Sequence, residues 1–159
     1  MVRFLQNYFY TPNEFAFMRT RNIGQPVVID SNILIKEIQE GRSFKPIAKR
    51  IKKHKSRLVI PESVLGEVFK ITGTKPISIM EKVYEYCKYP LTIDNTDEIE
   101  AESNRLVQRH NECKHPDSLI LATAKVTGSA LVSLDRELLE TAKLEGVQSF
   151  LPRNFVRWW

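Results

Sequence analysis

The chain has 159 residues, of which 42% are hydrophobic and 27% are charged, and its formal net charge at pH 7 is +5. This length and composition fit one folded domain, and we find no internal repeat and no low-complexity segment. Its apolar runs are shorter than the roughly 20 residues that cross a bilayer, and its first residues lack the apolar core of a secretory signal, so we expect a cytoplasmic protein without a membrane contact. The basic bias favours an anionic partner, of which nucleic acid is the commonest.

Residues 1–25 differ in character from the rest of the chain. They are rich in aromatic side chains, carry Arg3, Arg19 and Arg21, and have no clear hydrophobic period. We interpret them as an extension that packs on the domain or on a second copy of it. The domain itself is expected over residues 26–152, and residues 153–159 are expected to form an aromatic C-terminal tail.

From Pro26 onward, strand-like and helix-like segments alternate. Short apolar runs that are typical of buried strands occupy residues 27–29, 58–60, 91–93, 130–133 and 147–151. Helical spacing of apolar residues occurs over residues 33–38, 44–51, 61–73, 77–87, 115–128 and 134–146, and an acidic helix begins near Thr96. Pro61 is expected in the first helical turn after the second strand. This alternation predicts a mostly parallel sheet covered by helices on both faces.

Four carboxylates stand near the ends of the predicted strands. Asp30 directly follows the strand 27–29, and Asp135 comes two residues after the strand 130–133. Asp117 lies in the first turn of the helix that leads into the strand 130–133, and Glu67 lies in the second turn of the helix after the strand 58–60. Ligands of such sheets bind beyond the carboxyl ends of the strands, so all four side chains are expected to reach one rim.

Each of these acids has a simpler interpretation when it is taken alone. The three aspartates could cap helices or complement helix dipoles, and Glu67 could be a solvated helix residue. Four carboxylates that converge, however, repel one another and need cations, and Mg²⁺ and Mn²⁺ prefer oxygen ligands. A metal held in this way can activate water and stabilise charge on a phosphodiester. Nearby polar groups that could position water or phosphate are Ser31, Asn32 and Ser133.

Four segments of the sequence resemble the successive motifs of PIN-domain nucleases. They are VVIDSNILI (27–35), VLGEV (64–68), HPDSLILATA (115–124) and ALVSLDRELL (130–139). The resemblance spans roughly residues 26–152 and implies a three-layer α/β/α sandwich with a central parallel sheet of strand order 3-2-1-4-5. It also implies Mg²⁺- or Mn²⁺-dependent cleavage of RNA. The family's acidic quartet corresponds to Asp30, Glu67, Asp117 and Asp135, and its neighbouring polar positions correspond to Ser31 with Asn32 and to Ser133.

The family resemblance leaves the biological role open. Family members act as toxins of toxin–antitoxin pairs, in ribosomal RNA processing and in RNA decay. The compact size is similar to that of the stand-alone, VapC-like toxins, which implies an antitoxin-type protein inhibitor as a partner. The alternative is a non-catalytic RNA- or protein-binding module that keeps the PIN fold. Aromatic residues at both ends of the chain, Trp158 and Trp159 among them, favour a homodimer.

Other patterns compete with this reading or extend it. The basic stretch from Lys45 to Arg57 could be the solvated face of an amphipathic helix, or it could hold RNA phosphates through Lys49, Arg50 and Lys53. The grouping of His110, Cys113 and His115 could suggest zinc, but it has no second ligand pair. A phosphotransferase of the haloacid-dehalogenase type would need an aspartate where Asn32 stands, and a dinucleotide site would need a GxGxxG motif after the first strand.

Overall fold

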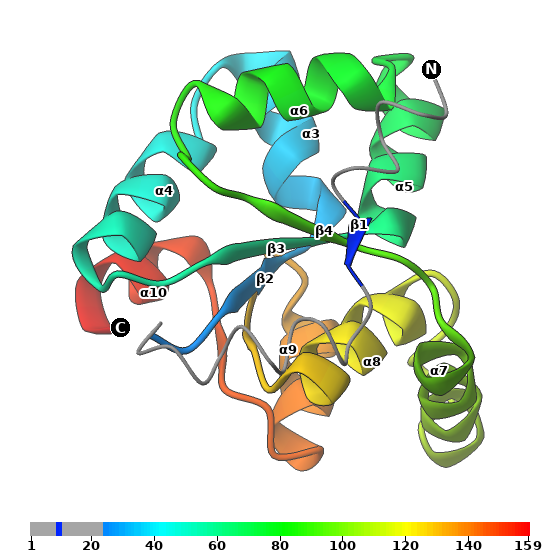
Figure 1. Ribbon diagram of the computed structural model, residues 1–159. Helices are drawn as coiled ribbons and strands as arrows, with labels where there is room; N and C mark the ends of the chain where they lie inside the picture. The colour runs from blue at the N-terminus through cyan, green and yellow to red at the C-terminus, as the bar shows by residue number, and fades with distance from the viewer. Residues whose placement is uncertain (1–8, 11–23) are drawn as a thin grey trace.

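The computed structural model describes Phe9–Tyr10 and residues 24–159. Figure 1 shows a central sheet between two layers of helices. The strands are β1 (Phe9–Tyr10), β2 (Val27–Ile29), β3 (Leu58–Pro61), β4 (Leu91–Ile93), β5 (Ala130–Val132) and β6 (Ser149–Phe150). The helices are α3 (Ser31–Glu40), α4 (Phe44–Lys53), α5 (Glu62–Thr72), α6 (Pro76–Tyr84), α7 (Asp97–Arg109), α8 (Asp117–Thr127), α9 (Arg136–Leu144) and α10 (Pro152–Trp158).

All pairings in the sheet are parallel, and the spatial order of its strands is β1-β4-β3-β2-β5-β6. Helices α3, α4, α5 and α6 cover one face, and α7, α8 and α9 cover the other (Figure 1). The five expected strands, β4-β3-β2-β5-β6 in space, have the order 3-2-1-4-5 in the numbering of the sequence prediction. The predicted fold class and strand order are therefore confirmed.

The central strands are buried on both sides, which explains why their sequences are continuous apolar runs and do not alternate. Every residue of β2 and β5 is fully buried. Helix α8 is also buried around most of its circumference, since it packs beneath the sheet with α7 against its other side. One continuous hydrophobic core results, and it fixes the carboxyl ends of β2, β3 and β5 relative to each other.

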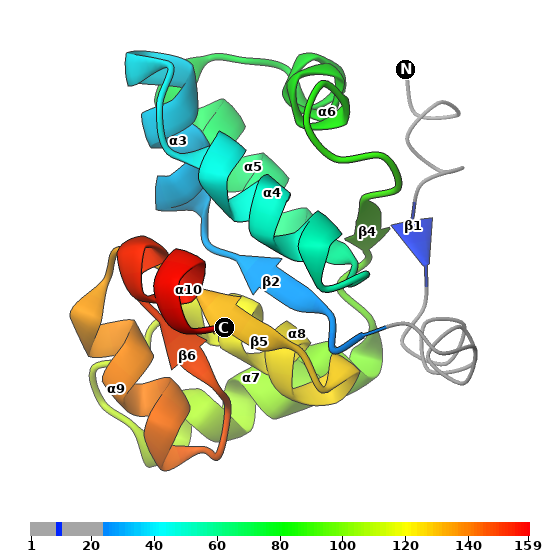
Figure 2. The ribbon, with the colours of Figure 1, turned by 90° about the vertical axis from the view of Figure 1, so that its left-hand side faces the viewer.

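Two details differ from the sequence expectations. Pro61 is the last residue of β3 and not part of the first helical turn, because its backbone is extended, with ψ of 145°. Phe9–Tyr10 pairs with Thr92 and Ile93 and adds a sixth strand beside β4 (Figure 2), where we expected no strand. The interpretation of residues 1–25 otherwise lies outside the described residues, apart from Gly24 and Gln25.

The C-terminal tail forms the helix α10, which packs against α4 and β6. Phe155 is fully buried, and the Trp159 ring lies 4.8 Å from the Phe155 ring and 4.7 Å from the His54 ring, between centroids. Trp158 remains 68% exposed. No helix in the described part of the chain combines the length and the apolar character needed to cross a bilayer.

Candidate active site

Asp30 stands at the junction of β2 and α3 because an aspartate both ends the strand and caps the helix. Its backbone is extended, and its carboxylate accepts a hydrogen bond of 2.7 Å from the Ser31 backbone nitrogen. The residue is 2% exposed. This burial raises the pKa of the Asp30 carboxyl, and the charge of Glu67 adds to the rise, while hydrogen bonds from Ser133 and Ser31 oppose it.

The Ser31 hydroxyl joins two of the four predicted acids. Its Oγ lies 2.8 Å from Glu67 Oε2 and 3.2 Å from Asp30 Oδ1. A hydroxyl has one proton, so it donates to one of these carboxylates at a time. Glu67 reaches this point from the second turn of α5, because α3 and α5 pack side by side on the same face of the sheet.

The Ser133 hydroxyl makes the corresponding connection toward Asp135. Ser133 is fully buried, and its Oγ donates to Asp30 Oδ2 at 2.6 Å and accepts from the Asp135 backbone nitrogen at 2.9 Å. The Asp135 carboxylate caps α9 by accepting from the backbone nitrogens of Glu137 and Leu138, at 3.0 and 3.3 Å. The carboxyl ends of β2 and β5 are neighbours in the sheet, and this adjacency brings the two aspartates together.

Asn32 completes the same hydrogen-bonded network. Its Nδ2 donates to Asp30 Oδ2 at 3.1 Å and to Ser133 Oγ at 3.3 Å, and its Oδ1 accepts from the Leu134 backbone nitrogen at 3.2 Å. The amide orientation is thereby fixed from both ends. The three polar residues predicted to support the acids thus contact Asp30 directly.

Asp117 is the first residue of α8 and belongs to the same rim, because its carboxyl lies in the electrostatic field of the other three acids. The pKa of its carboxyl is raised to about 7, mostly by burial and, in decreasing order, by the negative charges of Asp30, Asp135, Glu67 and Glu137. A carboxyl perturbed by all three other predicted acids shares their electrostatic environment. A small hollow at this place is lined by both Asp117 and Asp135.

Two further acids at this rim were missed by the sequence reasoning. Glu112 and Glu137 line the hollow beside Asp117, together with the buried Cys113. The thiol pKa of Cys113 is raised to about 11 by burial and by the charges of Asp117, Glu112, Glu145 and Asp135. The position of Glu137 in the first turn of α9, two residues after Asp135, is the signal that could have indicated it.

The chemistry of this donor set fits a hard divalent cation. Its donors are carboxylate and hydroxyl oxygens, their mutual repulsion is relieved by a cation, and no ion pair within the described chain neutralises any of the four predicted acids. The side chains do not close on one point: among the described residues, no three His, Cys, Asp or Glu side chains stand close enough to hold an ion as they are placed.

The predicted RNA-binding residues lie away from these acids. Lys49 and Lys53 are exposed on the second half of α4, and Arg50 is partly buried with its Nε lacking a hydrogen-bond partner among the described residues. This half of α4 leads into the amino end of β3, whereas the acids follow the carboxyl ends of the strands. The structure therefore places Lys49, Arg50 and Lys53 toward the opposite rim.

The three residues of the candidate zinc group, His110, Cys113 and His115, have different contacts. His110 Nε2 lies 3.2 Å from Glu145 Oε1, within a cluster that also contains Arg105 and Lys125. Cys113 is buried beside Asp117, and His115 is exposed. Each of the three residues has a different environment.

Comparisons with solved structures identify proteins of the same fold. VapBC of Salmonella typhimurium bound to DNA has a TM-score of 0.61 and 17% identity, and the match covers 80% of this chain and 98% of that one. VapBC2 of Rickettsia felis bound to a promoter DNA fragment has a TM-score of 0.62 and 15% identity, with 80% and 98% covered. A toxin–antitoxin complex of Klebsiella pneumoniae has a TM-score of 0.58 and 23% identity, with 79% and 97% covered.

These low identities establish a likeness of fold alone, and a comparison with curated protein sequences finds no match. The sequence pattern of the PIN domain, in contrast, matches residues 27–144. That range contains the elements from β2 to α9 and all four predicted acids. The chain therefore belongs to the PIN domain family, whose members are generally nucleases.

Proposed function

We propose that this PIN-domain protein is a metal-dependent endoribonuclease that hydrolyses RNA phosphodiester bonds. Its catalytic and metal-binding residues would be Asp30, Glu67, Asp117 and Asp135. The observation that supports this most strongly is the hydrogen-bonded network in which two buried serine hydroxyls connect the Asp30 carboxylate to the Glu67 carboxylate and to the Asp135 backbone. The raised pKa of Asp117 supports the inclusion of the fourth.

Mg²⁺ or Mn²⁺, when bound by these carboxylates, would supply a Lewis acid that activates water and stabilises charge on the phosphodiester. The chain's own residues would hold this arrangement in place. Ser133 and Asn32 orient Oδ2 of Asp30, and Ser31 orients Glu67 while its backbone nitrogen holds Oδ1 of Asp30. Residues locked by such contacts keep a site in its productive geometry. With a pKa near 7, Asp117 can also take up or release a proton near neutral pH.

The biological setting proposed here is that of a toxin. The Klebsiella pneumoniae structure described above is a toxin–antitoxin complex of the same fold, which supports an antitoxin-type protein inhibitor as a partner. We also propose a cytoplasmic location. The exposed Trp158 on α10 supports the earlier expectation of a homodimer, because a large aromatic side chain at the surface favours a contact with another molecule.

Cleavage of a mixed RNA preparation tests the proposed activity. Wild-type protein with Mg²⁺ or Mn²⁺ should produce fragments, chelation should stop the reaction, and Asp30→Asn should lower the rate by at least about a hundredfold. Asp97→Asn is the matched control, because Asp97 is an exposed acid in the first turn of α7 and outside the cluster. Equal rates for wild type and Asp30→Asn would reject the assignment. RNA binding without cleavage by the wild type would favour the non-catalytic module.

A further inference from the structure

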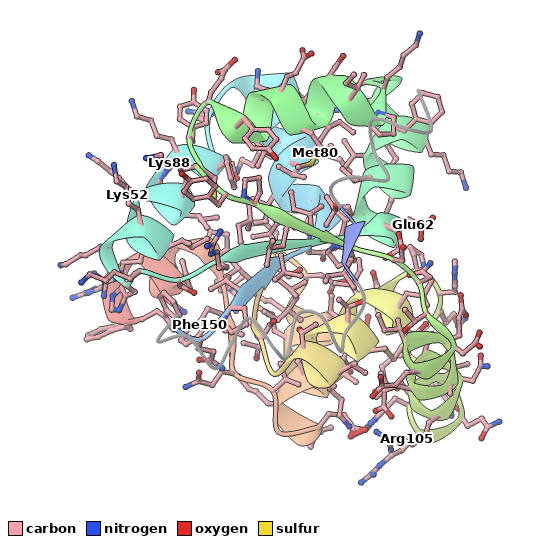
Figure 3. All side chains as sticks on the ribbon, viewed as in Figure 1. Lys52, Glu62, Met80, Lys88, Arg105 and Phe150 are labelled. Carbon is pink, nitrogen blue, oxygen red and sulfur yellow. The ribbon has the colours of Figure 1, made fainter. Side chains whose placement is uncertain are left out.

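A larger hollow lies at the opposite rim of the sheet from the acids, between the end of α4 and the segment that joins α6 to β4. Its volume is about 490 Å³, which is within the usual range of roughly 300–1,000 Å³ for ligand pockets. In Figure 3, Lys52 and Lys88 mark this side of the molecule, and Glu62 marks the side where β3 ends. We call this hollow the tyrosine pocket; its charged and aromatic lining residues are Lys52, Lys55, Arg57, Lys88, Glu85, Tyr84, Tyr86 and Tyr89.

The tyrosine pocket carries an excess of positive charge. Four of its lining residues are cationic and one, Glu85, is acidic. None of the four cations forms an ion pair within the described chain. The charge extends beyond the hollow, because residues 42–57 contain eight Lys and Arg residues and no Asp or Glu. Such a surface is stabilised by an anion, and its extent fits several phosphates better than one.

One of these cations is held in an unusual backbone conformation. Lys55 has φ of 52°, in the left-handed region where Gly or Asn is favoured. The turn is fixed by hydrogen bonds from the Lys55 nitrogen to the Lys52 oxygen and from the Ser56 nitrogen to the Ile51 oxygen, both 3.0 Å long. The backbone from which the Lys55 side chain starts is therefore a hydrogen-bonded turn at the end of α4.

The aromatic side of the tyrosine pocket contacts neighbouring side chains. Arg57 Nη1 donates to the Tyr89 backbone oxygen at 3.2 Å, and the guanidinium carbon lies 5.2 Å from the centre of the Tyr89 ring. The Tyr86 ring contacts the buried Phe44 ring edge-on, with 6.1 Å between centroids. Tyr89 is 59% exposed and Tyr86 is 37% exposed. Unpaired nucleotide bases stack on such rings and on guanidinium planes.

We propose that the tyrosine pocket binds a single-stranded segment of RNA, with phosphates on its lysines and a base against Tyr86 or the Arg57–Tyr89 pair. This inference rests on the proposed ribonuclease function and adds a substrate contact remote from the acidic cluster. A strand bound there can hold the RNA while another part of it reaches Asp30. The pocket therefore selects for RNA long enough to span both rims.

Binding in the absence of cleavage tests this contact directly. The probe is a fluorescently labelled single-stranded oligoribonucleotide, and the protein is full-length Asp30→Asn in EDTA, measured by anisotropy at several salt concentrations. Adding Lys52→Gln and Lys88→Gln should weaken binding about tenfold and reduce the log–log salt slope by about one. The matched control is Lys75→Gln with Lys143→Gln, two exposed lysines outside the pocket, which should change affinity by less than about twofold. Equal weakening by both pairs, or by neither, overturns the proposal.

The aromatic contribution has its own readout. Tyr89→Leu should weaken binding about tenfold while leaving the salt slope unchanged, because it removes a stacking surface and no charge. Photocrosslinking with 5-iodouridine in the same oligoribonucleotide should map to Tyr86 or Tyr89 by mass spectrometry. Crosslinks that avoid both tyrosines overturn the proposal, as does the absence of RNA binding.

The two proposals fail in different ways. If Asp30→Asn abolishes cleavage but the pocket variants bind RNA like the parent, the tyrosine pocket is wrong and the nuclease assignment stands. If RNA crosslinks to the pocket but the wild type never cleaves it, the nuclease assignment is wrong and the pocket stands.

Discussion

At the scale of single residues, the Ser133 hydroxyl connects the Asp30 carboxylate to the backbone of Asp135. It is fully buried, donates to Asp30 and accepts from the Asp135 backbone. Ser133→Ala would leave that nitrogen without its partner and remove one of the bonds that lower the Asp30 pKa. We expect the free energy of unfolding to fall by about 1–3 kcal/mol, measured by urea denaturation.

Ser63 provides the control for that substitution. Its hydroxyl oxygen is also buried but has no hydrogen-bond partner in the described part of the chain. Ser63→Ala therefore removes the same atom without breaking a bond, and we expect a change of less than about 0.5 kcal/mol. If the two variants unfold at the same urea concentration, the Ser133 bonds do not contribute to stability.

Some residues of the candidate site could be predicted from the sequence, and others could not. Asp30 and Asp135 could be predicted because each follows a strand closely, and strand ends meet in a parallel sheet. Ser31 and Ser133 were named as neighbours, but their bridging roles depend on distances of a few ångströms that no spacing rule provides. Glu112 was missed because it lies in the loop before α8, where no period constrains it.

At the scale of elements, a cluster of charged side chains joins the three helices α7, α8 and α9. Glu145, at the end of α9, accepts bonds from Arg105 of α7 at 3.0 Å and from Lys125 of α8 at 3.4 Å, and lies 3.2 Å from His110. Its side chain is 4% exposed. Burial would raise the pKa of Glu145, but its partners outweigh burial and lower it. The ionised form therefore fastens α9 to the other two helices.

Breaking this cluster should loosen the helical layer without touching the acidic rim. We expect Glu145→Gln to lower the free energy of unfolding by about 1–3 kcal/mol at neutral pH, because charged hydrogen bonds are lost. The lowered pKa means that this stabilisation is present above the unfolded value, near 4.5, and is lost as pH falls through the folded value. Urea denaturation at neutral and acid pH measures both effects.

Glu140→Gln is the control for this substitution, since Glu140 is exposed on the same helix and forms no ion pair within the described residues. It should have little effect at either pH. A loss of stability that is equal for both variants, or one that persists unchanged in acid, would contradict the role given to Glu145.

Elements with a long hydrophobic period were predictable, and short ones were not. Helix α4 was identified from four apolar residues at helical spacing, and all four are buried. Phe9–Tyr10 was missed because two residues cannot display an alternating pattern, and their pairing with β4 is a long-range contact. The Glu145 cluster was also missed because it depends on long-range contacts, since its members come from three separate helices.

For the molecule as a whole, the parallel sheet separates two kinds of charge. The carboxyl ends of its strands gather acids, and the amino ends of β3 and β4 lie beside the cations of the tyrosine pocket. The net charge of +5 for the whole chain therefore differs from the local charge at either rim. An anionic polymer would be attracted to one rim, and a divalent cation would be needed at the other before a phosphate could approach.

The repulsion among the acids at one rim predicts that a divalent cation stabilises the folded chain in a pH-dependent way. The pKa of Asp117 is about 7 in the folded chain, above its ordinary value of 3.8, so the folded state without metal holds this proton more tightly than the unfolded state does. The free energy of unfolding should then fall as pH rises between these two values. A metal ion replaces the proton, so its stabilising effect should grow over the same range and level off above it.

Thermal unfolding with MgCl₂, compared with NaCl of equal ionic strength, measures this effect. Mg²⁺ at about ten times its Kd contributes about 1.4 kcal/mol, which corresponds to a rise in Tm of about 3–5 °C for a chain of this size. We expect that rise at about pH 7.5 and a smaller one at about pH 5.5. Asp30→Asn should lose most of it, Asp117→Asn should lose its pH dependence, and Asp97→Asn should keep both. A Tm that responds equally to MgCl₂ and NaCl would mean that these acids tolerate one another without a bound cation, which would remove the physical basis of the proposed active site.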